Sequence, residues 1–161
     1  MRKTMNTIDL KKLILEIVRK AAILKDRYTE EKSAPVNWTC IFSQSQKEYD
    51  ELITVAKRIG KAIKETPTGL IFQIDPIKTI SGDLHLLKIR KYDATRPEKG
   101  DADFTVRNHN KFKNKYLKKK EFTLIQRPEF EMVELMDKNF DVRAYFSHPT
   151  QEELLGIKNR K

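Results

Sequence analysis

The sequence of 161 residues contains one cysteine, Cys40, and only five glycines. A single cysteine excludes a disulfide framework and a cysteine-based zinc site. It also favours a reducing compartment, so we expect a cytoplasmic protein. The glycines do not cluster, which argues against a glycine-rich loop that cradles nucleotide phosphates. No apolar run is long enough to span a membrane, and the start of the sequence lacks the apolar core of a signal peptide, so we expect no membrane partner.

Histidine is also scarce. The three histidines, His85, His109 and His148, share no metal-ligand spacing, and no Ser/His/Asp pattern accompanies them. We therefore expect no cofactor and no bound metal. These residue types leave open whether the protein is an enzyme.

Charge is abundant. The sequence has 33 Lys and Arg against 23 Asp and Glu, a net charge of +10 and a pI near 9.6. A positive field of this size attracts nucleic acid or an acidic ligand. Lysine predominates over arginine, which also fits a charge that serves solubility, because specific phosphate recognition favours the arginine fork.

Periodicity predicts the elements. Residues 7–28 have the apolar stripe of a helix, and a polar linker to Pro35 separates this helix from the remaining chain. We expect this first segment, 1–35, to pack on its own domain. Residues 36–44 read as a strand, and Ser45 with Glu48 has the capping-box spacing that starts a helix, which Gly60 ends. Further strands are predicted at 69–74 and 83–93.

The second half repeats this layout. The predicted elements are a strand at 102–107, a helix at 110–120, strands at 122–127, 130–137 and 140–148, and a helical stub in 151–161. We therefore predict an α+β fold. It consists of two βαβββ-like modules within 36–150, which form a curved mixed sheet, with an extra N-terminal helix. Residues 88–103 span the junction between the modules.

The second module carries a family resemblance. ADFTVRNHNKFKNKYL (102–117) is similar to the opening strand and helix of vicinal oxygen chelate proteins, such as glyoxalase I, ring-cleaving dioxygenases and bleomycin-resistance proteins. FEMVELMDKNFDVRAYFSHP (130–149) is similar to their final hairpin. The resemblance implies paired βαβββ modules and a ligand-binding cleft lined by the sheet. It also implies that a homodimer is a candidate assembly, and the extra helix is available for it. RPEKGDADF (96–104) resembles segments of uncharacterised prokaryotic proteins, which implies no activity.

The metal ligands of that superfamily are not matched. Metal-using members place His or Glu on the first and last strands of each module, whereas VNWTCIF (36–42) has neither. ADFTV offers only Asp103, and the glutamate position of the last strand falls on about Ala144. The resemblance therefore implies a member that binds a small molecule without a metal.

The junction supplies the candidate site. Lys88 and Arg90 lie two residues apart, so they share one face of a strand, with His85, Leu87 and Ile89 on the other. If the basic face lines the cleft, it can bind a carboxylate or phosphate. The candidate ligand-binding residues are Lys88, Arg90, Arg96, Asp101, Asp103 and Glu134. The competing interpretation is a solvated edge strand with Asp93 and Glu98 as ion-pair partners.

Two other functions compete. Asp101 and Asp103 share a strand face and, with Glu134, could hold a divalent metal for hydrolysis. In the structural alternative, Asp101 caps the turn after Gly100 and Asp103 pairs with a basic neighbour.

The other function is binding of nucleic acid or the ribosome by a Lys-rich helix within 107–120. Its candidate residues are Arg107, Lys111, Lys113, Lys115, Lys118, Lys119 and Lys120. Against it, Phe112 and Tyr116 have the spacing of a core-facing stripe rather than of a base-stacking surface.

Overall fold

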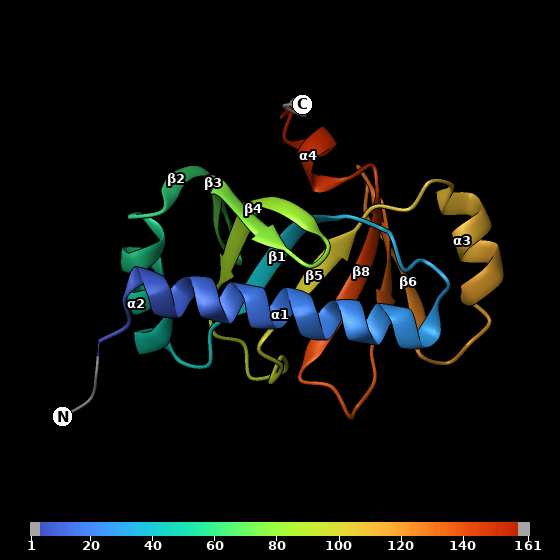
Figure 1. Ribbon diagram of the computed structural model, residues 1–161, viewed down its shortest axis with the longest axis horizontal. Helices are drawn as coiled ribbons and strands as arrows, with labels where there is room; N and C mark the ends of the chain where they lie inside the picture. Colours follow the sequence, from blue (N-terminus) through green and yellow to red (C-terminus); the bar gives the residue numbers. More distant parts are fainter. Residues whose placement is uncertain (1–3, 158–161) are drawn as a thin grey trace.

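A computed structural model describes residues 4–157, in which four helices and eight strands form one α+β unit (Figure 1). The elements are α1 (Thr7–Tyr28), β1 (Val36–Phe42), α2 (Gln46–Ala56), β2 (Gly60–Thr66), β3 (Gly69–Thr79), β4 (Gly82–Arg90), β5 (Gly100–Phe104), α3 (His109–Tyr116), β6 (Phe122–Gln126), β7 (Glu131–Leu135), β8 (Val142–His148) and α4 (Gln151–Leu154). No helix within residues 4–157 is long and apolar enough to cross a membrane.

The strands form a single open sheet in the order β2-β3-β4-β1-β5-β8-β7-β6. Each half is a βαβββ module whose first strand runs parallel to its last, β1 with β4 and β5 with β8. The two first strands pair antiparallel at the centre of the sheet. The predicted α+β fold with two βαβββ modules is therefore confirmed, and the second module repeats the strand order of the first in reverse.

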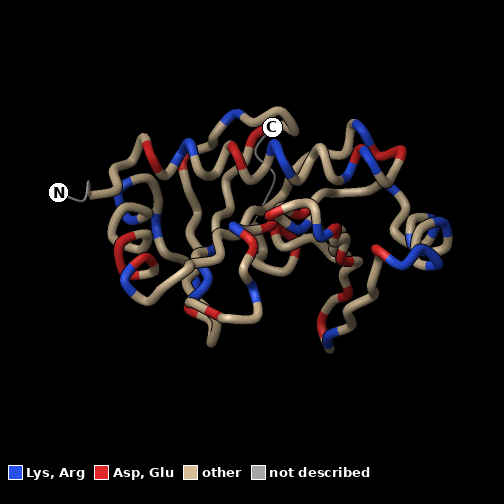
Figure 2. Tube along the Cα trace, turned by 90° about the horizontal axis from the view of Figure 1, so that it is seen from below, with Lys and Arg blue, Asp and Glu red and all other residues tan. Residues whose placement is uncertain are grey.

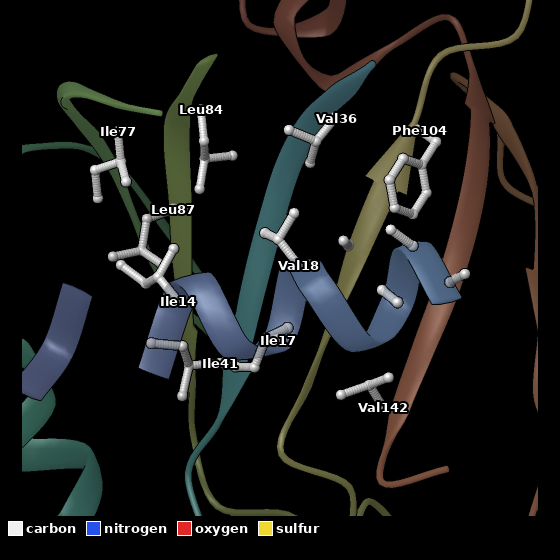
Figure 3. Close-up of a cluster of buried hydrophobic side chains, with 14 of the residues drawn as sticks. Ile14, Ile17, Val18, Val36, Ile41, Ile77, Leu84, Leu87, Phe104 and Val142 are labelled. Carbon is white, nitrogen blue, oxygen red and sulfur yellow. The ribbon is translucent and has the colours of Figure 1, made fainter. Parts of the chain in front are cut away.

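Helix α1 covers one face of this sheet, while α2 and α3 lie at its two ends (Figure 1). Asn6 and Asp9 form a capping box that starts α1, and its apolar stripe is fully buried. Ile14, Ile17 and Val18 point towards strand residues of both modules (Figure 3). The N-terminal helix thus shares its hydrophobic core with residues 36–150.

Strand β2 was not predicted. Most of its residues are exposed, and KAIKE has no run of alternating apolar residues that would indicate a strand. It forms because β3 supplies hydrogen bonds along one edge of the sheet. Gly60, read as a helix stop, is the first residue of this strand. A Cβ atom at this position would lie only 2.5 Å from the Gln73 carbonyl oxygen.

An irregularity in the pairing of β3 with β4 corrects the predicted face of His85. The register with β3 shifts between Gln73 and Ile77, so Leu84 and Leu87 both face the main core. His85 instead approaches α4, where its Nε2 lies 3.2 Å from Glu152 Oε1. Leu87 and Ile89 do lie opposite Lys88 and Arg90. Moreover, β4 lies between β3 and β1, so the competing interpretation of a solvated edge strand was wrong.

The last strand, β8, places Ala144 on the side of the sheet that faces α1. Ala144 is fully buried in the core shared with α1. Its neighbours Arg143 and Tyr145 therefore occupy the opposite face. The position aligned with the glutamate of metal-using proteins is thus not on the ligand-facing side of β8.

Candidate functional site

A pocket of about 430 Å³ lies on the sheet face away from α1, which is large enough for a small-molecule ligand. Both modules, the segment between them and α4 contribute to its wall. Its lining residues are Trp38, Cys40, Lys64, Thr66, Thr68, Ile71, Lys88, Arg90, Arg96, Asp101, Asp103, Ile125, Arg127, Glu129, Phe130, Met132, Tyr145, Gln151, Leu154 and Leu155. The bulk of the wall comes from strand positions, which fix its shape.

Five of the six predicted candidates line this one pocket, namely Lys88, Arg90, Arg96, Asp101 and Asp103. Glu134 does not reach the wall. It lies behind Tyr145, whose hydroxyl donates a 2.6 Å hydrogen bond to Glu134 Oε2. The structure therefore places five charged residues of the junction, 88–103, around one pocket.

Three strands place Lys88, Cys40 and Asp101 side by side. Cys40 is the register partner of Lys88 on β4 and of Asp101 on β5. Because neighbouring strands are about 4.8 Å apart, the Cα atoms of Lys88 and Asp101 are separated by about 10 Å. Burial raises the pKa of the Cys40 thiol, so the residue between Lys88 and Asp101 is uncharged.

The cationic side of the pocket has few acidic partners. Lys88 Nζ donates a 2.6 Å hydrogen bond to the neutral Thr68 hydroxyl, and burial lowers its pKa. Arg90 and Arg96 both approach Asp93, at 3.8 and 3.9 Å, which is long for an ion pair. Arg96 also lies over the Phe42 ring, 5.4 Å from its centroid. Asp93 is therefore a partner as expected, but Glu98 is not.

Glu98 instead pairs with Arg143, a residue that sequence reasoning missed. Arg143 Nε and Nη2 approach Glu98 Oε1 at 2.9 and 2.8 Å, and its Nη1 lies 3.2 Å from Glu134 Oε2. Burial acts to lower the pKa of Arg143, but Tyr145 and Glu98 together raise it. Alternation along VRAYFSH was the available signal, since it places Arg143 and Tyr145 on one face.

Asp103 is held by neutral donors. Its Oδ1 accepts from Asn37 Nδ2 at 3.2 Å and from the Ser147 backbone N–H at 3.1 Å, and its Oδ2 accepts from the Ser147 hydroxyl. Burial raises its pKa to about 6, although these hydrogen bonds oppose the rise. The expected pairing with a basic neighbour was wrong.

Asp101 differs from the other carboxyls. It is buried, and its Oδ1 has no hydrogen-bond partner within the described part of the chain. Burial, reinforced by the nearby Asp103, raises its pKa to about 8. The expected cap of the turn after Gly100 is therefore not made by this oxygen. Asp101 presents a carboxyl that is largely protonated at neutral pH.

The two aspartates do not make a metal centre. Within residues 4–157, no group of three or more His, Cys, Asp or Glu side chains is arranged to hold a metal ion. The oxygens of Asp103 already accept hydrogen bonds, and Glu134 is engaged by Arg143 and Tyr145. The arrangement thus gives no support to the hydrolase alternative.

The Lys-rich segment lies at one end of the molecule (Figure 1). Figure 2 shows Lys but no acidic residue along α3, whereas α2 carries several acids. Lys113 and Lys115 are paired with Glu131 and Glu30, at 2.8 and 2.6 Å. Phe112 and Tyr116 are buried, so they offer no base-stacking surface. The other five candidates are exposed: Arg107, Lys111, Lys118, Lys119 and Lys120.

Comparisons with known proteins support the fold alone. No protein-family model and no curated protein matches the sequence. A solved structure from structural genomics, Protein EC4020, is similar with a TM-score of 0.71. The match covers 96% of this chain and 97% of that one at 9% sequence identity. A match with so low a sequence identity shows a similar fold and says nothing about function.

Proposed function

We propose that the protein binds a small anionic molecule in the pocket between its two modules, using its own side chains rather than a bound metal. The anionic group is a carboxylate or phosphate, and Lys88, Arg90 and Arg96 bind it. Lys88 and Arg90 come from β4 and Arg96 from the segment after this strand, so three cations converge on one wall.

The shortage of acidic partners for these cations carries the proposal. Lys88 is hydrogen-bonded to a neutral hydroxyl, and the two arginines share Asp93 at long distances. The Nε of Arg90 is buried without a hydrogen-bond partner within residues 4–157. Buried cationic groups are normally paired, and an unpaired one is costly. An anionic ligand would supply the missing charge and acceptors.

We also propose membership of the vicinal oxygen chelate superfamily. The module order, the central antiparallel pair of first strands and the pocket on one sheet face support it. Positions on β4 that face the pocket carry Lys88 and Arg90, which repel a metal cation. The side chains of the pocket therefore favour binding of an anion without a metal.

Titration calorimetry and thermal shift with phosphate, sulfate and small carboxylates test the proposal. We expect a carboxylate or phosphate to bind the wild type and raise its melting temperature. Arg90→Ala should weaken binding about tenfold or more, because a charge-assisted hydrogen bond is lost. Arg58→Ala, which removes an exposed arginine after α2, is the matched control and should bind as the wild type does.

Two results would overturn the proposal. One is the absence of binding by every anion tested. The other is equal affinity in the wild type, Arg90→Ala and Arg58→Ala, since that would place the anion elsewhere on a molecule of net charge +10. Lys88→Met repeats the test at a second wall position.

A further inference from the structure

The pocket is polarised between the modules. Four of its five cations come from the first module or just after it, Lys64, Lys88, Arg90 and Arg96, and the exposed Arg127 comes from the second module. The second module supplies the acids, as Asp101 and Asp103 on β5 and as Glu129. A ligand that offers only an anionic group would satisfy one side of the wall.

Among the acidic residues that line the pocket, Asp101 is the one available to bind a ligand. The oxygens of Asp103 already accept hydrogen bonds from Asn37 and Ser147. Glu129 is exposed to solvent. Asp101 alone among the acids of the wall combines burial with an oxygen, Oδ1, that has no partner within residues 4–157. A buried acceptor left unpaired is costly, so a donor from the ligand would be favourable there.

The distance between Lys88 and Asp101 restricts how far apart the two binding groups of the ligand must be. Lys88 and Asp101 flank Cys40 on three neighbouring strands, so their Cα atoms are about 10 Å apart. The ammonium group of Lys88 turns towards Thr68, in the segment before β3. The anionic group and the donor must therefore be separated by several bonds. A neutral donor would satisfy Oδ1, but the adjacent Asp103 favours a positively charged one.

We propose that the ligand is amphoteric: it carries a carboxylate or phosphate bound by Lys88 and Arg90, and a primary ammonium group that donates to Asp101 Oδ1. This inference rests on the proposed function, and it adds the second recognition group. It assigns Asp101 to ligand binding, and it leaves Asp103 and Glu134 as residues that hold the wall in place.

Proton linkage provides a signature of the ammonium group. The charged or titratable groups around Asp101 are Lys88 on β4, Cys40 on β1, Asp103 on β5, Arg143 and Tyr145 on β8, and Arg96. In the free protein the pKa of Asp101 is raised to about 8. A bound ammonium favours the carboxylate and lowers that pKa, so binding at pH 7 should release a proton. A purely anionic ligand opposes ionisation and should release none.

The experiment compares ω-amino carboxylates with one to five methylene groups against unsubstituted and ω-hydroxy carboxylates of equal length. For at least one length, we expect the amino compound to bind about tenfold more tightly than both counterparts. Asp101→Asn should remove this preference and still bind the carboxylate. Asp141→Asn is the control, because Asp141 pairs with Lys20 of α1 and does not line the pocket. Calorimetry in two buffers of different ionisation enthalpy should show proton release by the wild type.

Failure of this inference is distinct from failure of the proposed function. If the carboxylates bind but no amino compound binds more tightly, or if binding releases no proton, the amphoteric ligand is wrong and anion binding stands. Equal affinity of hydroxy and amino compounds also removes the ammonium. If no member of the three series binds, both proposals fail. The proton measurement needs only the wild type, so the test does not depend on folding of Asp101→Asn.

Discussion

Lys88 and Arg143 occupy equivalent positions in the two modules, yet their surroundings differ. Each lies on the last strand of its module, and each is the register partner of a residue on the first strand, Cys40 or Asp101. Lys88 is hydrogen-bonded to the neutral Thr68. Arg143 is bound by two carboxylates, Glu98 and Glu134.

This difference separates a cation available to a ligand from a cation that supports the fold. Both side chains project from the sheet face away from α1, so position alone does not distinguish them. What distinguishes them is whether the protein supplies the counter-charge. The first strands differ in the complementary way: Cys40 is uncharged, and Asp101 carries the unpartnered oxygen. The same architecture thus offers a cation on one side of its central strand pair and a hydrogen-bond acceptor on the other.

The largest expected effect is on stability, and it tests this comparison directly. Arg143→Met would leave Glu98 and Glu134 without their cation in a largely buried environment. We expect the free energy of unfolding to fall by about 3–5 kcal/mol, which is typical when one partner of a buried pair is removed. Lys88→Met should change it by about 1 kcal/mol or less, because no buried carboxylate loses a partner. Urea unfolding measures both; effects of equal size would contradict the distinction.

An intermediate effect is expected from Asp101, through the pH dependence of stability. Its pKa is about 8 in the folded protein and about 4 when the chain is unfolded. Between these values the folded state binds more protons than the unfolded state, so the free energy of unfolding falls as pH rises from 4 to 8. Asp101→Asn should reduce this fall and be more stable than the wild type at pH 8 by about 1–3 kcal/mol. Asp103 contributes a fall between pH 4 and 6 in both proteins.

Urea unfolding at pH 4.5, 6 and 8 provides the measurement. Asp141→Asn, which alters an aspartate outside the pocket, should keep the wild-type slope between pH 6 and 8. An Asp101→Asn variant whose slope between pH 6 and 8 equals that of the wild type would show that Asp101 is not a buried and unpaired carboxyl.

The sequence indicated the modules and five of the residues that line the pocket, because their signals are local. The apolar stripe of α1, the capping boxes and the alternation around Lys88 and Arg90 are read directly from residue order. Strand β2 left no such signal, since an exposed edge strand is held by backbone hydrogen bonds to β3 rather than by apolar side chains. The irregular pairing of β3 with β4 opposite His85 shifts the side-chain pattern of β4 by one residue, and nothing in DLHLLKIR marks where this occurs.

The sequence also failed to predict which side chains Glu98 and Asp103 contact. Glu98 lies close to Arg90 and Arg96 in sequence, and pairing among these neighbours was the simple expectation. Glu98 instead bonds to Arg143, which is 45 residues away and reaches it only because β5 and β8 are parallel neighbours. Likewise, Asp103 is satisfied by Asn37 and Ser147, from two different strands. Such contacts depend on sheet order and register, which local patterns do not encode.

The smallest expected effect concerns the helices at the two ends, acidic α2 and basic α3. Because Lys113 and Lys115 are ion-paired and the aromatic residues of α3 are buried, we expect RNA and DNA to bind weakly and without sequence preference. In a gel shift, binding at low salt should disappear near 150 mM salt. Replacing Lys118, Lys119 and Lys120 with Gln should weaken the low-salt shift no more than the same change at Lys47, Lys57 and Lys61, which are exposed lysines of the first module. A shift that survives 150 mM salt and is lost only in the first variant would instead support a nucleic-acid function for the second module.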